Sequence, residues 1–283
     1  MTCEKIDLKH RDLLSPLLKK MDTRIAEYSF ANLYLFRNKH NYEVITDKFI
    51  FIKGKSYDGK TYLMPTVDLK EISVEYVSDI LKDVDFIFPV DEKWLKFFPS
   101  ERFVFDYDDG DTDYLYDIEK MRTFAGKKLH GKRNLLHQFL RSYSCEPAPL
   151  YGPDRIKEAI EILEKWQEDT GQAKEETDFN ACLEALKLYD ELVICGFIYY
   201  VDKGPAGFII GEEIGGDTFA LHFAKGVVQY KGIYQFMFNN FSKILPEKYR
   251  FVNFEQDLGI ENLRLSKMSY EPDIFLKKYR VRM

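Results

Sequence analysis

The sequence predicts a mixed α/β protein (α+β sheets) built from two successive domains of the same architecture. Apolar residues recur both at helical spacing and in short alternating or continuous runs typical of strands. Two helices, a run of short strands, a helix, a strand and a helix follow one another once in each half of the 283 residues. Three prolines crowd residues 145–153, and proline disfavours helix for the residue before it. We therefore expect a linker there, between domains at 1–145 and 154–283.

In the first half of the chain, the residue patterns predict the following elements in order. Leucines at helical spacing over 8–18 and apolar residues over 28–36 predict two helices. Short β-type runs follow, and the turn-forming residues of KSYDGK precede the third of them. The expected strands and helices after residue 40 are strands at 43–45, 49–52 and 62–64, a helix at 71–81, a strand at 86–89, a helix at 92–98 and a strand at 102–107.

The second half repeats this order with little similarity of sequence. Its patterns predict helices at 154–168 and 178–189, strands at 192–200, 206–212 and 218–224, a helix within 227–245, a strand within 249–259 and a helix within 260–270. The shared order of elements indicates a duplicated unit.

Composition narrows the class of protein. Hydrophobic residues make up 45% of the chain, with 23 Phe and 19 Tyr, which is enough for packed cores and excludes global disorder. The net charge of −6 argues against a coat of nucleic acid but is compatible with a local basic site. The four cysteines have no paired spacing, so we expect reduced thiols and a cytoplasmic protein. The longest apolar run, 192–201, is too short to cross a bilayer, so no transmembrane segment is expected.

The strand within 249–259 carries the first group of candidate site residues. Asn253, Glu255 and Asp257 alternate along it and therefore point to one side of an extended chain. Arg264 and Lys267 are neighbours on one face of the next helix. Acyl transfer needs a base and a positive group, so Glu255 or Asp257 is the predicted catalytic base, and Asn253 and the two cations are predicted to bind substrate. The alternative is a buried ion-pair network that holds the helix to the sheet.

A basic segment is the second candidate. Residues 121–144 contain no Asp or Glu, whereas Lys128 and several other cations occur there. Arg133, His137 and Arg141 form a stripe at intervals of four residues on the predicted helix. Such a stripe suits a phosphate-bearing partner, which would be coenzyme A, a phospholipid head group or the acceptor end of a tRNA. A solvated helix face without a ligand is the alternative.

Several blocks resemble a known family. The segment NFEQDLGIENLRLSKMSYEPD resembles the closing signature of the domain shared with the C-terminal part of phosphatidylglycerol lysyltransferases, and EYSFANLYLFRNKHNYEV, DTDYLYDIEKM and GKKLHGKRNLLHQFLRSY are similar to other blocks of the family. The resemblance implies a bacterial protein with two tandem domains of the GNAT N-acetyltransferase fold, as in the Fem-type aminoacyltransferases. It also implies an acyl- or aminoacyltransferase that acts on an amine or hydroxyl acceptor without a metal.

The turn VVQYKGIY bears on the donor. In GNAT enzymes a loop of the form Arg/Gln-x-x-Gly-x-Gly/Ala holds the pyrophosphate of coenzyme A, and the resemblance places Gln229 and Gly232 in that loop. Tyr234 stands where Gly or Ala is expected and is bulky enough to obstruct the pyrophosphate. The donor implied is therefore either a coenzyme A ester or an aminoacyl-tRNA, with no cofactor assigned. The competing function is a non-catalytic module of the same fold that binds a phosphorylated metabolite or nucleotide. The oligomeric state is left open.

Overall fold

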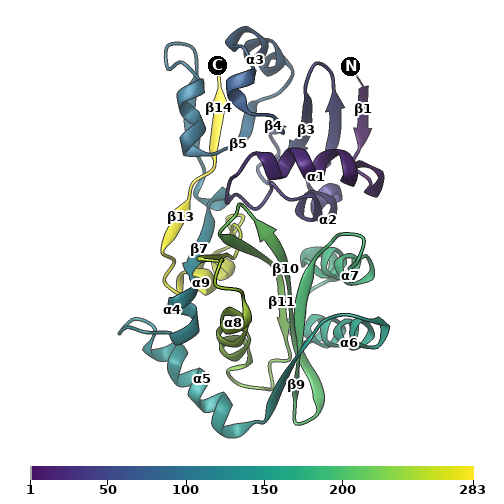
Figure 1. Cartoon of the computed structure of the whole chain (residues 1–283), viewed down its shortest axis with the longest axis vertical. Coiled ribbons are helices and arrows are strands. Elements are labelled where there is room, and N and C mark those ends of the chain that lie inside the picture. The colour runs from purple at the N-terminus through teal and green to yellow at the C-terminus, as the bar shows by residue number, and fades with distance from the viewer. Residues whose placement is uncertain (1) are drawn as a thin grey trace. The chain divides into compact units, whose positions relative to one another are not determined.

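A computed structural model describes residues 2–283 and divides the chain into two compact units (Figure 1). The first unit comprises Met1–Tyr114, Glu255–Arg264 and Phe275–Met283. The second unit comprises Leu115–Phe254 and Leu265–Ile274. Each unit contains one seven-stranded sheet with helices packed against it, which is the mixed α/β architecture that the sequence predicts. The last residues of the chain return to the first unit.

The sheet of the first unit is mostly antiparallel. Its order is β1-β2-β3-β4-β5-β14-β6, and only β4 and β5 are parallel neighbours. The C-terminal strand β14 is therefore inserted between β5 and β6. The helices of this unit are α1 (Arg11–Lys20), α2 (Phe30–His40) and α3 (Val74–Ile80). Its strands are β1 (Thr2–Lys5), β2 (Glu43–Thr46), β3 (Ile50–Lys55), β4 (Thr61–Pro65), β5 (Phe86–Val90), β6 (Val104–Tyr107) and β14 (Tyr279–Arg282).

Helix α2 shows how local sequence fixes an element that positions the site. The Ser29 hydroxyl accepts a hydrogen bond from the N–H of Asn32 at 3.1 Å and caps the start of the helix. Asn41 ends the helix in a left-handed conformation with φ of 51°, which asparagine tolerates better than most residues. Most of the first half of α2 is buried, so its polar residues point into the interior of the unit.

The second sheet has the order β13-β7-β12-β11-β10-β9-β8, with β11 and β12 parallel. Helices α6 and α7 lie on one face and α8 on the other (Figure 1). The strands are β7 (Asp113–Asp117), β8 (Cys145–Pro149), β9 (Cys195–Val201), β10 (Gly204–Ile214), β11 (Thr218–Gly226), β12 (Phe251–Asn253) and β13 (Ile274–Leu276). The helices are α4 (Ile118–Thr123), α5 (His130–Ser142), α6 (Pro153–Thr170), α7 (Phe179–Lys187), α8 (Ile233–Ile244) and α9 (Glu261–Met268). Three elements, β7, β13 and α9, have residues in both units.

The residues expected to form a linker contribute a strand in the structure. Residues Cys145–Pro149 form β8, which pairs antiparallel with β9 at the edge of the second sheet. An edge strand tolerates proline because the missing N–H leaves no bond unmade on the open side. Pro153 then occupies the first turn of α6, where a missing N–H is also harmless. By compactness, residues 115–144 group with the second half of the chain.

Smaller differences concern the ends of elements. The predicted helix at 92–98 is a 3₁₀ helix, Glu92–Phe97, and the predicted helix at 71–81 is divided into short 3₁₀ turns around α3. The strand expected at 192–200 begins only at Cys195. No helix between residues 2 and 283 combines the length and the apolar character that a membrane crossing requires.

Candidate functional site

Glu255 lies in the first unit, directly after β12. Its carboxylate accepts a hydrogen bond from Asn32 Nδ2 of α2 at 2.9 Å, and its side chain remains partly exposed. Its φ of 60° places a glutamate in the left-handed region, where a side chain with a Cβ is strained. Such strain persists only where the surroundings enforce it, and it is concentrated at functional sites.

Asp257 lies two residues later and is completely enclosed. Arg264 Nε donates to Asp257 Oδ2 at 2.7 Å and Arg264 Nη2 donates to Oδ1 at 3.1 Å. The Tyr114 hydroxyl at 2.6 Å and the Gly259 N–H at 2.8 Å complete the set of donors. Burial alone would raise the pKa of Asp257, but the hydrogen bonds from Arg264, Tyr114 and Gly259 outweigh it and hold this pKa below its ordinary value. Asp257 is therefore an ionised partner of Arg264.

A cavity of about 340 Å³ in the first unit lies beside this pair. Arg264 and Tyr114 line it together with Phe275 and Lys277. The Arg264 side chain is 42% exposed and contacts Asp257 through its Nε–Nη2 edge, so the guanidinium is partly open to an anion. The exposed Phe275 ring packs edge-on against Tyr114 with 5.7 Å between the ring centroids. The cavity thus offers a guanidinium donor next to an aromatic wall.

A buried ionic cluster lies in the same unit. The fully enclosed Lys278 Nζ is 2.7 Å from both carboxylate oxygens of Glu27 and 2.7 Å from Asp113 Oδ1, and it also donates to Gln256. Burial raises the pKa of Glu27 to about 7, with Asp113 adding to the rise and Lys278 opposing it. Burial lowers the pKa of Lys278, but the two carboxylates outweigh burial and raise it. The ammonium therefore stays charged and donates to Gln256, the residue that follows Glu255.

These partners were not identified from the sequence. These residues lie in three separate parts of the chain, namely Glu27 and Asn32 in a largely apolar run, Asp113 and Tyr114 in an acidic segment, and Lys278 in a basic one. A charged residue inside an apolar run is the signal that could have revealed Glu27, because burial of a charge requires a partner. Two of the three parts are blocks that resemble the family, and the structure brings these blocks to one polar centre.

Two other predicted residues, Asn253 and Lys267, belong to the second unit. Lys267 is 9% exposed, and its Nζ donates to the Phe254 carbonyl at 2.6 Å. Asn253 is completely buried in β12, whose backbone pairs with β7 and β11. Both side chains are enclosed within the second unit.

The basic stripe on α5 divides into two kinds of residue. Arg133 donates to the carbonyl oxygens of Phe124 and Gly126 at the start of the helix. Lys128 pairs with Glu271 at 2.9 Å. His137 and Arg141 are exposed. In the stripe on the helix, Arg133 is thus bonded to the backbone, whereas His137 and Arg141 are open to solvent.

The turn before α8 is tightly packed. Gly232 has a φ of 94°, and a Cβ there would lie 2.5 Å from the Leu135 carbonyl oxygen of α5. The Tyr234 hydroxyl accepts a hydrogen bond from the Gly226 N–H at 3.2 Å, while Gln229 is exposed. Other N–H groups of the turn already have backbone acceptors, namely those of Val227, Tyr230 and Ile233. Close helix packing accounts for the glycine.

Metal chemistry has no evident ligand set in the part of the chain that the structure describes. Residues 2–283 contain no group of three or more His, Cys, Asp or Glu side chains arranged to hold a metal ion.

Comparison with known proteins agrees with this architecture. The family model described as phosphatidylglycerol lysyltransferase, C-terminal, matches residues 18–282. An uncharacterized protein of Mycoplasmoides gallisepticum is 26% identical over 182 residues, 61% of this chain; the match spans 56% of that relative's length. A solved protein of unknown function from Bacteroides thetaiotaomicron is 28% identical, with 99% of both chains covered and a TM-score of 0.83.

Two further solved structures share the fold at low identity. The C-terminal domain of a putative lysylphosphatidylglycerol synthetase from Agrobacterium fabrum is 13% identical, with a TM-score of 0.66 over 97% of this chain and 92% of that one. FemX is 9% identical, with a TM-score of 0.57 over 100% of this chain and 97% of FemX. The predicted fold, two tandem GNAT-like domains of the Fem type, is confirmed.

Proposed function

The chain belongs to the phosphatidylglycerol lysyltransferase C-terminal family, and from this membership we propose that it transfers an acyl or aminoacyl group to an amine or hydroxyl acceptor. The aminoacyltransferase-like fold supports the proposal. The acceptor's nitrogen or oxygen attacks the carbonyl carbon of the donor ester, the bond from that carbon to the leaving group breaks, and the acceptor loses a proton. A base is needed for that proton.

The environment of Glu255 is the single observation that carries the proposal. Its carboxylate is partly exposed, lies on a strained backbone and is oriented by Asn32. Asp257 is enclosed and held by strong donors, so it cannot touch an acceptor. We assign the base to Glu255, which takes the acceptor's proton and passes it to the leaving oxygen. Asp257 becomes a positioning residue for Arg264.

Arg264 supplies the positive charge. Its Nη1 group faces away from Asp257 and is suited to a phosphate or carboxylate of the substrate. Tyr114 and Asp257 fix the plane of the guanidinium, so the anion would be bound in one orientation. Lys277 lines the same cavity and adds a second cation.

The donor favoured by the geometry is an aminoacyl-tRNA. The packed turn around Gly232 disfavours the pyrophosphate of coenzyme A, which reduces the case for a coenzyme A ester. His137 and Arg141 offer exposed charge or hydrogen bonding to a phosphate backbone or a phospholipid head group. A cytoplasmic location belongs to this proposal, since aminoacyl-tRNA is present there.

A second candidate function is a non-catalytic module that binds a phosphorylated metabolite or nucleotide. The saturated Asp257–Arg264 pair favours it, because one of the two acids is occupied structurally. Incubation with labelled aminoacyl-tRNAs, acyl-coenzyme A esters, and lipid or amine acceptors separates the candidates. Transfer from aminoacyl-tRNA is the expected result. Tight binding of phosphorylated ligands without any transfer would replace the enzyme by the binding module.

A further inference from the structure

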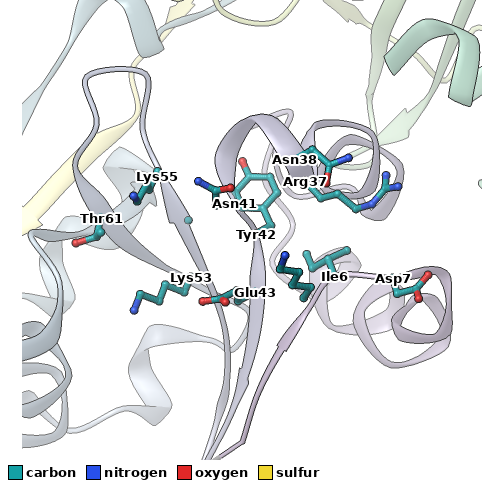
Figure 2. A pocket seen from close by; sticks show the side chains of 12 residues that line it. Ile6, Asp7, Arg37, Asn38, Asn41, Tyr42, Glu43, Lys53, Lys55 and Thr61 are labelled. Atoms are coloured by element: carbon teal, nitrogen blue, oxygen red, sulfur yellow. The ribbon is translucent and has the colours of Figure 1, made fainter. Parts of the chain in front are cut away.

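A second cavity of the first unit lies where β1 ends, β2 begins and β3 ends, below the turn from α2 to β2 (Figure 2). Its volume is about 530 Å³. Lys5, Arg37, Lys53 and Lys55 line it, against the two carboxylates of Asp7 and Glu43. None of the residues assigned to the transfer reaction lines this cavity.

The lining is positive in a chain that is negative overall. Four cations against two carboxylates leave an excess of two positive charges, while the whole chain carries −6. Glu43 is the cross-strand partner of Lys5 on one side and of Lys53 on the other, so these three side chains lie on one face of the sheet. One carboxylate between two lysines cannot neutralise both.

The floor of the cavity is rigid. Tyr42 is 3% exposed, its hydroxyl accepts a hydrogen bond from the Tyr62 hydroxyl at 3.0 Å, and its ring stacks on His40. A Cβ on Gly54 would lie 2.7 Å from the Tyr42 ring and 2.8 Å from the Tyr62 ring. Because Gly54 has no Cβ, the rings of Tyr42 and Tyr62 can lie against the β3 backbone. Their buried packing keeps the cavity open.

The size and the spread of charge define the ligand. Pockets for small organic molecules measure about 300–1,000 Å³, so this cavity is larger than one phosphate requires. Its cations come from β1, α2 and β3, and the amides of Asn38 and Asn41 add neutral hydrogen-bonding groups between them. We propose that this pocket binds a small organic anion with at least two separated negative groups, either a diphosphate or a polycarboxylate. The site is separate from the proposed transfer site.

Calorimetric titration of the full chain at low ionic strength tests the proposal. The probes are inorganic pyrophosphate, citrate and inorganic phosphate. We expect saturable one-to-one binding of pyrophosphate or citrate, with inorganic phosphate at least about tenfold weaker because it makes fewer charge-assisted contacts. The tighter of the two larger probes identifies the ligand as a diphosphate or a polycarboxylate.

Two charge-reversal variants in the first unit distinguish binding in the pocket from non-specific electrostatic attraction to the protein. Lys53→Glu should weaken binding at least about tenfold, since it replaces an attractive contact by a repulsive one. Lys96→Glu changes the net charge equally at an exposed position outside the pocket and should leave the affinity unchanged. Equal weakening by both variants, equal affinity for phosphate and pyrophosphate, or titrations that do not saturate would each overturn the proposal. Melting curves of both variants confirm that they are folded.

Discussion

Two buried acids of the first unit, Asp257 and Glu27, have pKa values shifted in opposite directions. Donors surround Asp257 and, against the effect of burial, hold its pKa below the ordinary value. Glu27 shares Lys278 with a second carboxylate, and burial keeps its pKa near neutrality. One buried carboxylate, that of Asp257, thus serves as the ionised partner of Arg264, whereas the other, that of Glu27, titrates near neutral pH.

Glu27 makes stability depend on pH. Its pKa in the folded protein is about 7, above its ordinary value of 4.5, so the folded state binds more protons than the unfolded state between these pH values. The contribution of Glu27 to stability is therefore complete below pH 4.5 and is lost as the pH rises to about 7, by up to about 1.4 kcal/mol per pH unit. Denaturant unfolding of the wild type and of Glu27→Gln across this range measures the effect.

The difference between the two unfolding curves isolates this group from all other titrations. We expect Glu27→Gln to have the flatter dependence between pH 4.5 and 7. Parallel curves for the two proteins would show that Glu27 titrates normally and would remove the raised pKa.

Among the elements, helix α5 has one side that packs within the second unit and another that faces solvent. Phe139 stacks on Phe236 of α8 with 4.8 Å between the ring centroids, and Leu136 is buried beside it. The opposite side presents His137 and Arg141 to solvent. The helix therefore joins packing of the second unit to an exposed basic surface, and its two arginines should respond differently to mutation.

Arg141→Glu should weaken binding of tRNA without lowering the melting temperature, since an exposed charge contributes little to stability. Arg133→Glu should instead destabilise the protein by about 1–3 kcal/mol, because the carbonyl groups of Phe124 and Gly126 lose their donor. Filter binding at several salt concentrations and thermal unfolding measure the two effects. Unchanged tRNA affinity and salt dependence in Arg141→Glu would show that the exposed face of α5 does not bind tRNA.

Contact between α5 and the start of α8 can be tested at one glycine. Gly232→Ala should be more destabilising than Gly126→Ala, although both glycines have a φ of 94°. The added Cβ meets the Leu135 carbonyl at 2.5 Å in the first case and nothing within 4 Å in the second. The backbone strain is shared, so the difference of about 1–3 kcal/mol reports the close approach of the helices. Denaturant unfolding of both variants gives that difference, and equal losses would contradict the packing of α5 on the turn.

For the whole molecule, the sequence predicts the fold better than the site. Local periodicity and the repeated order of elements are enough for two mixed α/β units, because each element is determined by nearby residues. The resemblance of four blocks predicts the family. The Asp257–Arg264 pair also follows from short spacing, seven residues along the chain.

The remaining partners depend on contacts that periodicity does not encode. Lys278 and Glu27 are separated by 251 positions, and Asn32 and Glu255 by 223. Their meeting requires β14 to enter the sheet between β5 and β6, which no local pattern in the last residues predicts. The strand formed by residues 145–149 was missed for a related reason, since the place of these prolines at a sheet edge is a tertiary property.

The proposed division into domains at 1–145 and 154–283 leads to a test with fragments. A fragment of residues 1–145 lacks β14, which pairs with both β5 and β6, and Lys278, which balances Glu27 and Asp113. We expect this fragment to lack a cooperative unfolding transition until it is extended by residues 275–283 through a flexible connection. Circular dichroism during heating checks this. A cooperative transition of the 1–145 fragment alone would establish the division as drawn from the sequence.

The proposed function depends most on the different roles of the two acids after β12, Glu255 and Asp257. Glu255→Gln keeps the shape of the side chain and removes its ability to accept a proton. Asp257→Asn removes the anionic partner of the partly exposed Arg264. Rates of aminoacyl transfer and free energies of unfolding, measured on both variants, therefore separate a base from a structural anchor.

That pair of variants is the most direct test of the proposed function. Glu255→Gln should lower the transfer rate by about 10²–10⁴ with little change in stability. Asp257→Asn should cost about 1–3 kcal/mol of stability, since Arg264 remains partly solvated while Tyr114 and Gly259 lose a charged acceptor. Normal transfer by Glu255→Gln, with a loss of stability in both variants, would contradict the account and leave both acids as parts of the structure.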